Sequence, residues 1–208
     1  MIVTATTTGF NPQGSPVCLS LTGLITVLGV FGLQNQRFYI SFLLHPASIK
    51  RDNAWYRLVS GDFVHNDLVH LLINAFAFFA IGSELEEYLR STSAYGSLLF
   101  LVIYISSCFC GSFITFWKYR NDFTFSSAGA SGSILGCMLG FMILQPYHVA
   151  FYLPVFGAVM NIYTALIYMA VLISYRWRSG NPMVSYEVHL YGAMGGIIAT
   201  LIIMKVPV

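Results

Sequence analysis

Residues 123–175 form a run of 53 positions without a formal charge, and they read FTFSSAGASGSILGCMLGFMILQPYHVAFYLPVFGAVMNIYTALIYMAVLISY. A charged side chain at the centre of a bilayer costs at least about 2.5 kcal/mol, so such a run is typical of chain buried in lipid. About 20 apolar residues cross the hydrocarbon core. The run therefore predicts two crossings, with a break at Pro146, Tyr147 and His148.

Charge-free stretches outside this run predict four more crossings, at about 16–33, 68–89, 91–117 and 188–204. A short apolar piece at 38–44 is too short to cross and is expected at the membrane interface or on the bundle. We therefore predict an all-α polytopic membrane protein with six transmembrane helices. It forms a single domain over residues 1–208, with its core at about 55–204.

The composition supports this class of protein. Of 208 residues, 57% are hydrophobic and 9% are charged, with a mean hydropathy of +0.72, whereas soluble domains contain about 25% charged residues. Ten basic and eight acidic residues are spread thinly, so no basic block is present to bind nucleic acid. The expected partner is the lipid bilayer. Four cysteines in apolar stretches are expected to be small buried hydrophobes: Cys18, Cys108, Cys110 and Cys137.

Four polar side chains fall near the starts of the second, fourth and sixth predicted spans. His70 and Asn74 are four residues apart and share one helix face, Ser131 opens the fourth span, and His189 lies early in the sixth. Alternate spans run in the same direction, so the four positions are expected near one membrane surface. Polar side chains in lipid-embedded helices usually face one another. Taken singly, an intramembrane His or Asn more often forms a hydrogen bond between helices, but four such positions on three helices that run in the same direction favour a site.

Glycines predict that the fourth and sixth spans pack closely. They repeat every four residues in both spans, at Gly132, Gly136 and Gly140, and at Gly192 and Gly196. Stripes of small residues let two helix backbones approach each other. If these faces mate, Ser131 and His189 come within hydrogen-bonding reach.

A serine beside a histidine is the minimal activated nucleophile, because the imidazole accepts the hydroxyl proton as the oxygen attacks. Asn74, His70 and the Ser131 backbone N–H are candidate donors to the oxyanion that develops. The sequence offers no obvious acidic third member. It also offers no metal site, because His65 and His70 are five residues apart and have no carboxylate beside them in the membrane. We expect neither a metal nor a cofactor.

These residues stand in a recognisable series of blocks: Trp55-Tyr56-Arg57, His65, His70 and Asn74, Gly82 and Glu86, Gly129-Ala130-Ser131-Gly132, and His189-Leu190-Tyr191-Gly192 with Gly196. In this order, from about residue 55 to 200, the chain resembles the rhomboid family of intramembrane serine proteases. The resemblance implies a six-helix rhomboid-like bundle that cleaves the transmembrane segments of other membrane proteins, without metal or cofactor.

The resemblance also implies a role for each site residue. Ser131 would be the nucleophile and His189 the general base, while His70 and Asn74 would form the oxyanion hole. The remaining positions would be structural: Arg57, His65, Glu86, Gly129, Gly132, Gly192 and Gly196. The chain departs from the family at Leu135, where an aromatic residue often packs on the catalytic histidine. Tyr191 or Phe125 are the candidates to replace it.

Two alternatives stay open at this stage. A catalytically inactive relative would bind membrane helices without needing Ser131 or His189, and a transporter would require acidic residues at mid-span. The resemblance implies a multi-pass protein of the bacterial cytoplasmic membrane whose site opens away from the cytosol. Loop charges point the other way, because eight of the ten basic residues follow the first, third and fifth spans and cytoplasmic loops are usually the basic ones.

Overall fold

The computed structural model describes residues 14–153, 157–179 and 185–205. Its bundle helices are α1 (Pro16–Gln34), α5 (Leu68–Ala77) continued by the π-helical turn η2 (Phe78–Gly82) and α6 (Ser83–Thr92), α7 (Gly96–Tyr119), α8 (Ser131–Leu144), α9 (Thr164–Ser179) and α10 (Tyr186–Ile203). The first loop contains α2 (Gln36–Phe42), α3 (Pro46–Asp52), α4 (Arg57–Ser60) and η1 (Gly61–Phe63). Strands β1 (Val149–Leu153) and β2 (Gly157–Met160) and the turn η3 (Asn161–Tyr163) precede α9.

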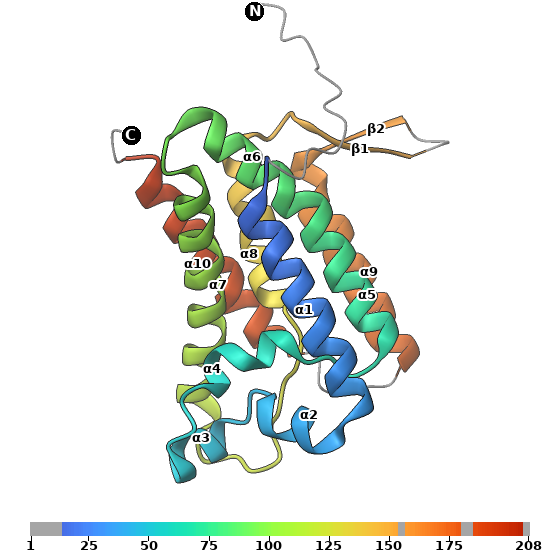
Figure 1. The fold of residues 1–208 in the computed structure, drawn as a ribbon, viewed down its shortest axis with the longest axis vertical. Coiled ribbons are helices and arrows are strands. Elements are labelled where there is room, and N and C mark those ends of the chain that lie inside the picture. The colour runs from blue at the N-terminus through green and yellow to red at the C-terminus, as the bar shows by residue number, and fades with distance from the viewer. Residues whose placement is uncertain (1–13, 154–156, 180–184, 206–208) are drawn as a thin grey trace, which may run out of the picture.

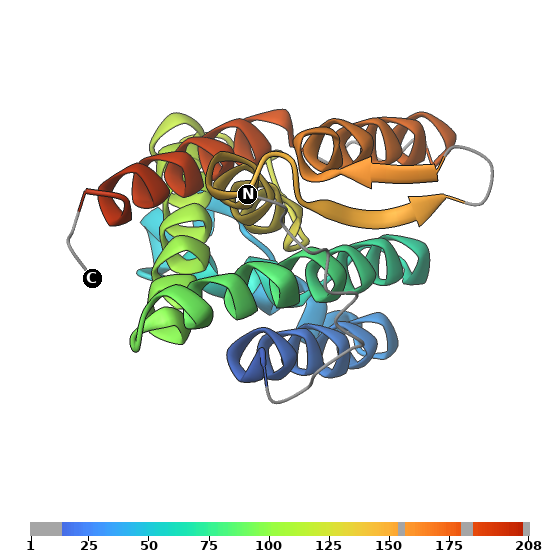
Figure 2. The same ribbon diagram turned by 90° about the horizontal axis from the view of Figure 1, so that it is seen from above.

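The bundle helices alternate in direction. In Figure 1, α5 with α6, α8 and α10 run upward, whereas α1, α7 and α9 run downward. The first-loop helices lie at the lower end and the β-hairpin at the upper end. Seen from above, α8 occupies the centre of the bundle (Figure 2). Its Ile134 and Phe141 are almost fully buried, in one core with Phe78 and Phe100.

Within the described residues, four helical stretches are long and apolar enough to cross a membrane: α1, α5 through α6, α7 and α10. Helices α8 and α9 are shorter, at 14 and 16 residues. Fourteen residues rise only about 21 Å, less than the roughly 30 Å of a hydrocarbon core. The structure therefore contains a membrane bundle, and two of the six predicted crossings are short helices.

The all-α prediction is wrong between α8 and α9, where the chain forms an antiparallel hairpin. The predicted break at Pro146 follows the end of α8 at Leu144, since proline disfavours helix at the residue before it. The next residues are mostly β-branched and aromatic, and they pair from Val149 opposite Met160 to Leu153 opposite Gly157. Gly157 takes a positive φ of 78°, which suits glycine at a turn.

Candidate active site

Ser131 is the first residue of α8 and is 4% exposed. The chain from α7 reaches it as a non-helical segment that climbs from the lower end into the bundle (Figure 1). Gly129 has a φ of 114°, and a Cβ there would lie 2.7 Å from Cε1 of His70. Glycine is therefore required for both conformation and space, and the turn before Ser131 packs directly on the His70 ring.

The first loop holds this segment along its length. Leu44 and Ser127 exchange two backbone hydrogen bonds of 2.9 Å, and the Gly129 N–H donates to the Gly61 carbonyl at 2.9 Å. Nδ1 of His45 accepts from the Ser48 N–H at the start of α3, which leaves Nε2 to donate to the Phe123 carbonyl, 3.2 Å away.

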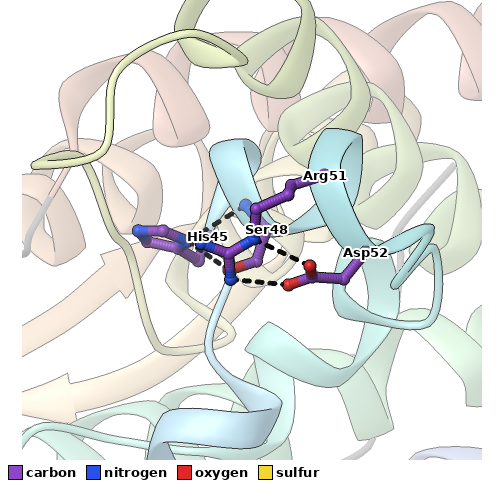
Figure 3. Close-up of polar contacts among 4 residues, drawn as sticks. All are labelled: His45, Ser48, Arg51 and Asp52. Atoms are coloured by element: carbon purple, nitrogen blue, oxygen red, sulfur yellow. Dashed lines mark hydrogen bonds and ion pairs between the residues drawn. The ribbon is translucent and has the colours of Figure 1, made fainter.

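Helix α3 itself is short and ends at the surface. Figure 3 shows the His45 ring against Ser48, with Arg51 paired to Asp52 at the exposed end of the helix. The Arg51–Asp52 pair is solvent-exposed and contributes little to stability. The contacts of His45 therefore matter more for the site than the ion pair does.

The predicted glycine faces of α8 and α10 are in contact. A Cβ at Gly132 would lie 2.8 Å from the Val188 carbonyl oxygen, and a Cβ at Gly192 would lie 2.6 Å from the Gly132 carbonyl oxygen. A Cβ at Gly196 would overlap the backbone of Gly136. The two backbones therefore touch. This contact places Gly132, the residue after Ser131, against Val188, the residue before His189.

His189 is 4% exposed, and Nδ1 of its ring lies 2.6 Å from the Ser185 carbonyl oxygen. A carbonyl accepts only, so Nδ1 bears the proton and Nε2 has the lone pair, the tautomer that a general base needs. Ser185 is also the N-cap of α10, where its hydroxyl accepts from the Val188 N–H. The backbone of this cap therefore orients the ring.

Of the two aromatic residues considered as supports for His189, Phe125 packs on another ring, while the role of Tyr191 stays a prediction. Phe125 stacks on Tyr119 with ring centroids 4.0 Å apart, and Tyr119 donates to Glu187 of α10 at 2.6 Å. Lys118 donates to the same carboxylate oxygen at 3.0 Å. These contacts join the end of α7 to the first turn of α10 at Glu187, two residues before His189.

His70 and Asn74 lie on one face of α5, and both are fully buried. Asp67 caps this helix by accepting from the His70 N–H at 2.9 Å. Asn74 Nδ2 donates to the His70 carbonyl at 2.8 Å, and Asn74 Oδ1 accepts from the Tyr168 hydroxyl of α9 at 3.1 Å. Our reading of the sequence missed both Asp67, an N-cap signal just before an apolar run, and Tyr168.

His65 precedes α5 and packs edge-on against the His70 ring, with centroids 5.1 Å apart. Its burial lowers the pKa of His65 well below the usual range, and the neighbouring His70 lowers it further. The ring is therefore neutral at pH 7. Within residues 14–153, 157–179 and 185–205, no three His, Cys, Asp or Glu side chains are grouped to hold a metal ion.

Asp62 is a buried acidic residue of the first loop that the sequence analysis did not single out. It is 8% exposed in η1, and its Oδ2 accepts from the Tyr104 hydroxyl at 3.1 Å and from the Ser133 hydroxyl. Burial raises its pKa to about 6. Its contacts run to the first turn of α8 rather than to His189. The carboxylate therefore ties the first loop to the helix that begins with Ser131.

Arg57 and Glu86 hold backbone and hydroxyl groups of other segments in place. The Arg57 guanidinium donates to the Ile40 and Leu43 carbonyls, both at 2.9 Å, within the first loop. Glu86 is fully buried, and its carboxylate accepts from the Cys18 N–H at 2.7 Å and from the Ser97 hydroxyl at 2.6 Å. It thereby joins the first turn of α1 to the first turn of α7, with a carboxylate at a helix N-terminus where it is favourable.

An apolar groove separates α5 from α9. Its inner part has a volume of about 470 Å³, and its residues come from α5 and η2, α8, β1, η3 and α9: Ile73, Phe76, Ala77, Ala80, Ile81, Met138, Tyr152, Leu153, Thr164, Ile167, Tyr168 and Val171. A second hollow of about 780 Å³ shares Ile73, Ile167 and Val171 with it and extends to Asp67 and Arg178. We call the two together the α5–α9 groove. It extends along α5 and α9 to Asp67 at the start of α5.

Comparisons with known proteins point to one family. The family model for the Rhomboid domain matches residues 52–206. Rhomboid protease GluP of Bacillus subtilis (strain 168) is 31% identical over 107 residues, which are 51% of this chain and 19% of that protein. RHOMBOID-like protein 4 of Arabidopsis thaliana is 30% identical over 129 residues, which are 55% of this chain and 30% of that protein. The chain thus spans less than a third of the length of either relative.

Proposed function

The chain belongs to the rhomboid family, and from that premise we propose that it is an intramembrane serine endopeptidase with a Ser131–His189 dyad. The observation that supports this most directly is the backbone contact between α8 and α10, which brings the residue after Ser131 against the residue before His189. The hydrogen bond from His189 Nδ1 to the Ser185 carbonyl also supports the proposal, because it keeps the proton on Nδ1 and leaves Nε2 with the lone pair that a base needs.

In the proposed reaction, His189 Nε2 takes the proton of the Ser131 hydroxyl while Oγ attacks the substrate carbonyl. The carbonyl oxygen becomes an oxyanion that His70, Asn74 and the Ser131 N–H stabilise. The imidazolium then gives its proton to the leaving amine, and the acyl-enzyme forms. Water, with His189 again as base, releases the second product and restores the serine.

The substrates we propose are transmembrane segments of other proteins, which enter from the bilayer through the α5–α9 groove. The groove is apolar where lipid or a substrate helix would lie, and it leads toward the start of α5, where His70 is. A helical substrate hides its carbonyls in intrahelical hydrogen bonds, so the segment to be cleaved must unwind locally. We further propose that α8 and α9 complete six crossings, in a bacterial cytoplasmic membrane with the site facing away from the cytosol.

The test is labelling by a fluorophosphonate probe together with cleavage of a transmembrane reporter. Wild type should react and cleave, whereas Ser131→Ala should lose both activities and His189→Ala should lose cleavage. Ser20→Ala is the matched control, because Ser20 lies on α1 and its hydroxyl donates to the Pro16 carbonyl of its own helix. Turnover by purified Ser131→Ala would refute the dyad. A wild-type protein that binds the reporter but neither reacts nor cleaves would instead identify an inactive family member.

A further inference from the structure

Tyr168 is a buried residue of α9 whose hydroxyl reaches across to α5. The side chain is 4% exposed, and its hydroxyl donates to Asn74 Oδ1 at 3.1 Å. A buried tyrosine hydroxyl usually finds a hydrogen-bond partner. Here that partner is Asn74, to which we assign an oxyanion-hole role, on α5, the helix that faces α9 across the α5–α9 groove.

The two contacts of Asn74 determine how its amide is oriented. Nδ2 must face the His70 carbonyl, 2.8 Å away, because a carbonyl only accepts. Oδ1 then faces Tyr168, whose hydroxyl supplies the donor. The nitrogen has two hydrogens, and the bond to His70 uses one of them. With Oδ1 held by Tyr168, the second hydrogen points in a defined direction.

We propose that Tyr168 is a positioning residue for the oxyanion hole, and that its hydrogen bond couples the α9 wall of the substrate groove to Asn74. The proposal rests on the proposed function. Without the Tyr168 hydroxyl, the Asn74 amide loses one of the two hydrogen bonds that fix its rotation. Its N–H donor is then no longer held in the orientation that stabilises the oxyanion. Because Tyr168 also lines the groove, a segment lodged there touches the residue that orients the donor.

Tyr168→Phe tests this directly, since it removes only the hydroxyl and keeps the ring that fills the groove. We expect kcat for a transmembrane reporter to fall about threefold to tenfold, the size of one ordinary hydrogen bond, with KM within about twofold of wild type. Fluorophosphonate labelling should slow by a similar factor. Tyr95→Phe is the matched control, because Tyr95 is 67% exposed between α6 and α7 and is not among the residues that line the groove, and it should behave as wild type.

A double-mutant cycle separates positioning from general packing. In an Asn74→Ala background, Tyr168→Phe should cause no further slowing of labelling, because the amide that it orients is gone. An equal loss with and without Asn74, a change confined to KM, or equal effects of Tyr168→Phe and Tyr95→Phe would each overturn the proposal. Ser131→Ala labelling tests the protease function separately, so that failure of one is distinguishable from failure of the other.

Discussion

The two sides of α8 are built differently. Toward α10 the helices touch backbone to backbone, and a single methyl at Gly192 would meet a carbonyl oxygen 2.6 Å away. Between α5 and α9, on the other side, lies a groove of about 470 Å³, bridged by the hydrogen bond from Tyr168 to Asn74. Close glycine packing fixes the distance between two helices, whereas a groove lets them separate. We infer that the proposed dyad sits in the rigid half and the proposed substrate path in the separable half.

The largest effect is expected from Gly196→Val, on the rigid side. A Cβ at Gly196 would overlap the Gly136 backbone, so the two branches of valine must force α8 and α10 apart. Yield of folded protein in detergent and reporter cleavage should fall together, to near zero. Gly23→Val is the control, since a Cβ at Gly23 meets nothing within 4 Å. Wild-type cleavage by the Gly196 variant would show that this side is not rigid.

Ala80→Phe places a ring in the groove and should have a smaller, selective effect. Cleavage of a transmembrane reporter should fall at least about tenfold, because the ring occupies apolar space that the substrate helix needs. Labelling by a small fluorophosphonate should stay within about twofold of wild type, since the contact between α8 and α10 is untouched. Equal losses of cleavage and labelling would contradict the division into two halves.

Asp62 offers a pH-dependent probe of the rigid side. Burial raises its pKa to about 6 from an ordinary 3.8, so between pH 4 and 6 the folded protein binds more protons there than the unfolded chain. Its contribution to stability therefore decreases as the pH rises through this window. Relative to Asp62→Asn, wild type should melt a few degrees higher at pH 5 than at pH 7.5. The comparison cancels the opposite effect of His65, which is present in both proteins. A difference in melting temperature that does not vary with pH would show that Asp62 has an ordinary pKa.

The smallest effect is expected from single-cysteine substitutions, which test the side of the membrane to which the proposed site opens. Single cysteines at Asp52 and Ala94 lie at opposite ends of the bundle and at exposed positions. Ser60 is unsuitable, because it is 7% exposed and its hydroxyl donates to the Phe42 carbonyl. With Cys110, the one native cysteine that is not buried, changed to serine, an impermeant thiol reagent outside intact cells should label Asp52→Cys and spare Ala94→Cys. The reverse pattern would support the orientation that loop charges favour.

Most helices of the bundle can be predicted from the sequence, because charged side chains are costly in the lipid core and are therefore rare in spanning segments. Charge-free runs predicted helices close to α1, α5 through α6, α7 and α10, and the glycine repeats predicted the contact between α8 and α10, which the structure has. The hairpin was missed because, in a charge-free run, strand and helix are equally apolar, and only the β-branched and aromatic content distinguishes them.

The less predictable parts of the candidate site are contacts between distant segments. Asp62 stands in a polar stretch, and nothing local indicates that it turns inward to meet Tyr104 and Ser133. Tyr168 is one aromatic residue among many in an apolar helix. The orientation of His189 depends on a backbone carbonyl, that of Ser185, and a main-chain acceptor has no residue type to recognise.

The first loop has a consequence for where this protein can be divided. The family match begins at residue 52, yet Leu44 and His45 lie before it and hold the segment that leads to Ser131. A fragment cut to the matched range would keep every proposed catalytic side chain and lose these outer supports. The segment that matches the family model is therefore shorter than the segment needed to hold the proposed site together. During synthesis Leu44 and His45 leave the ribosome well before Ser131, so a chain that begins at the matched range never contains these supports.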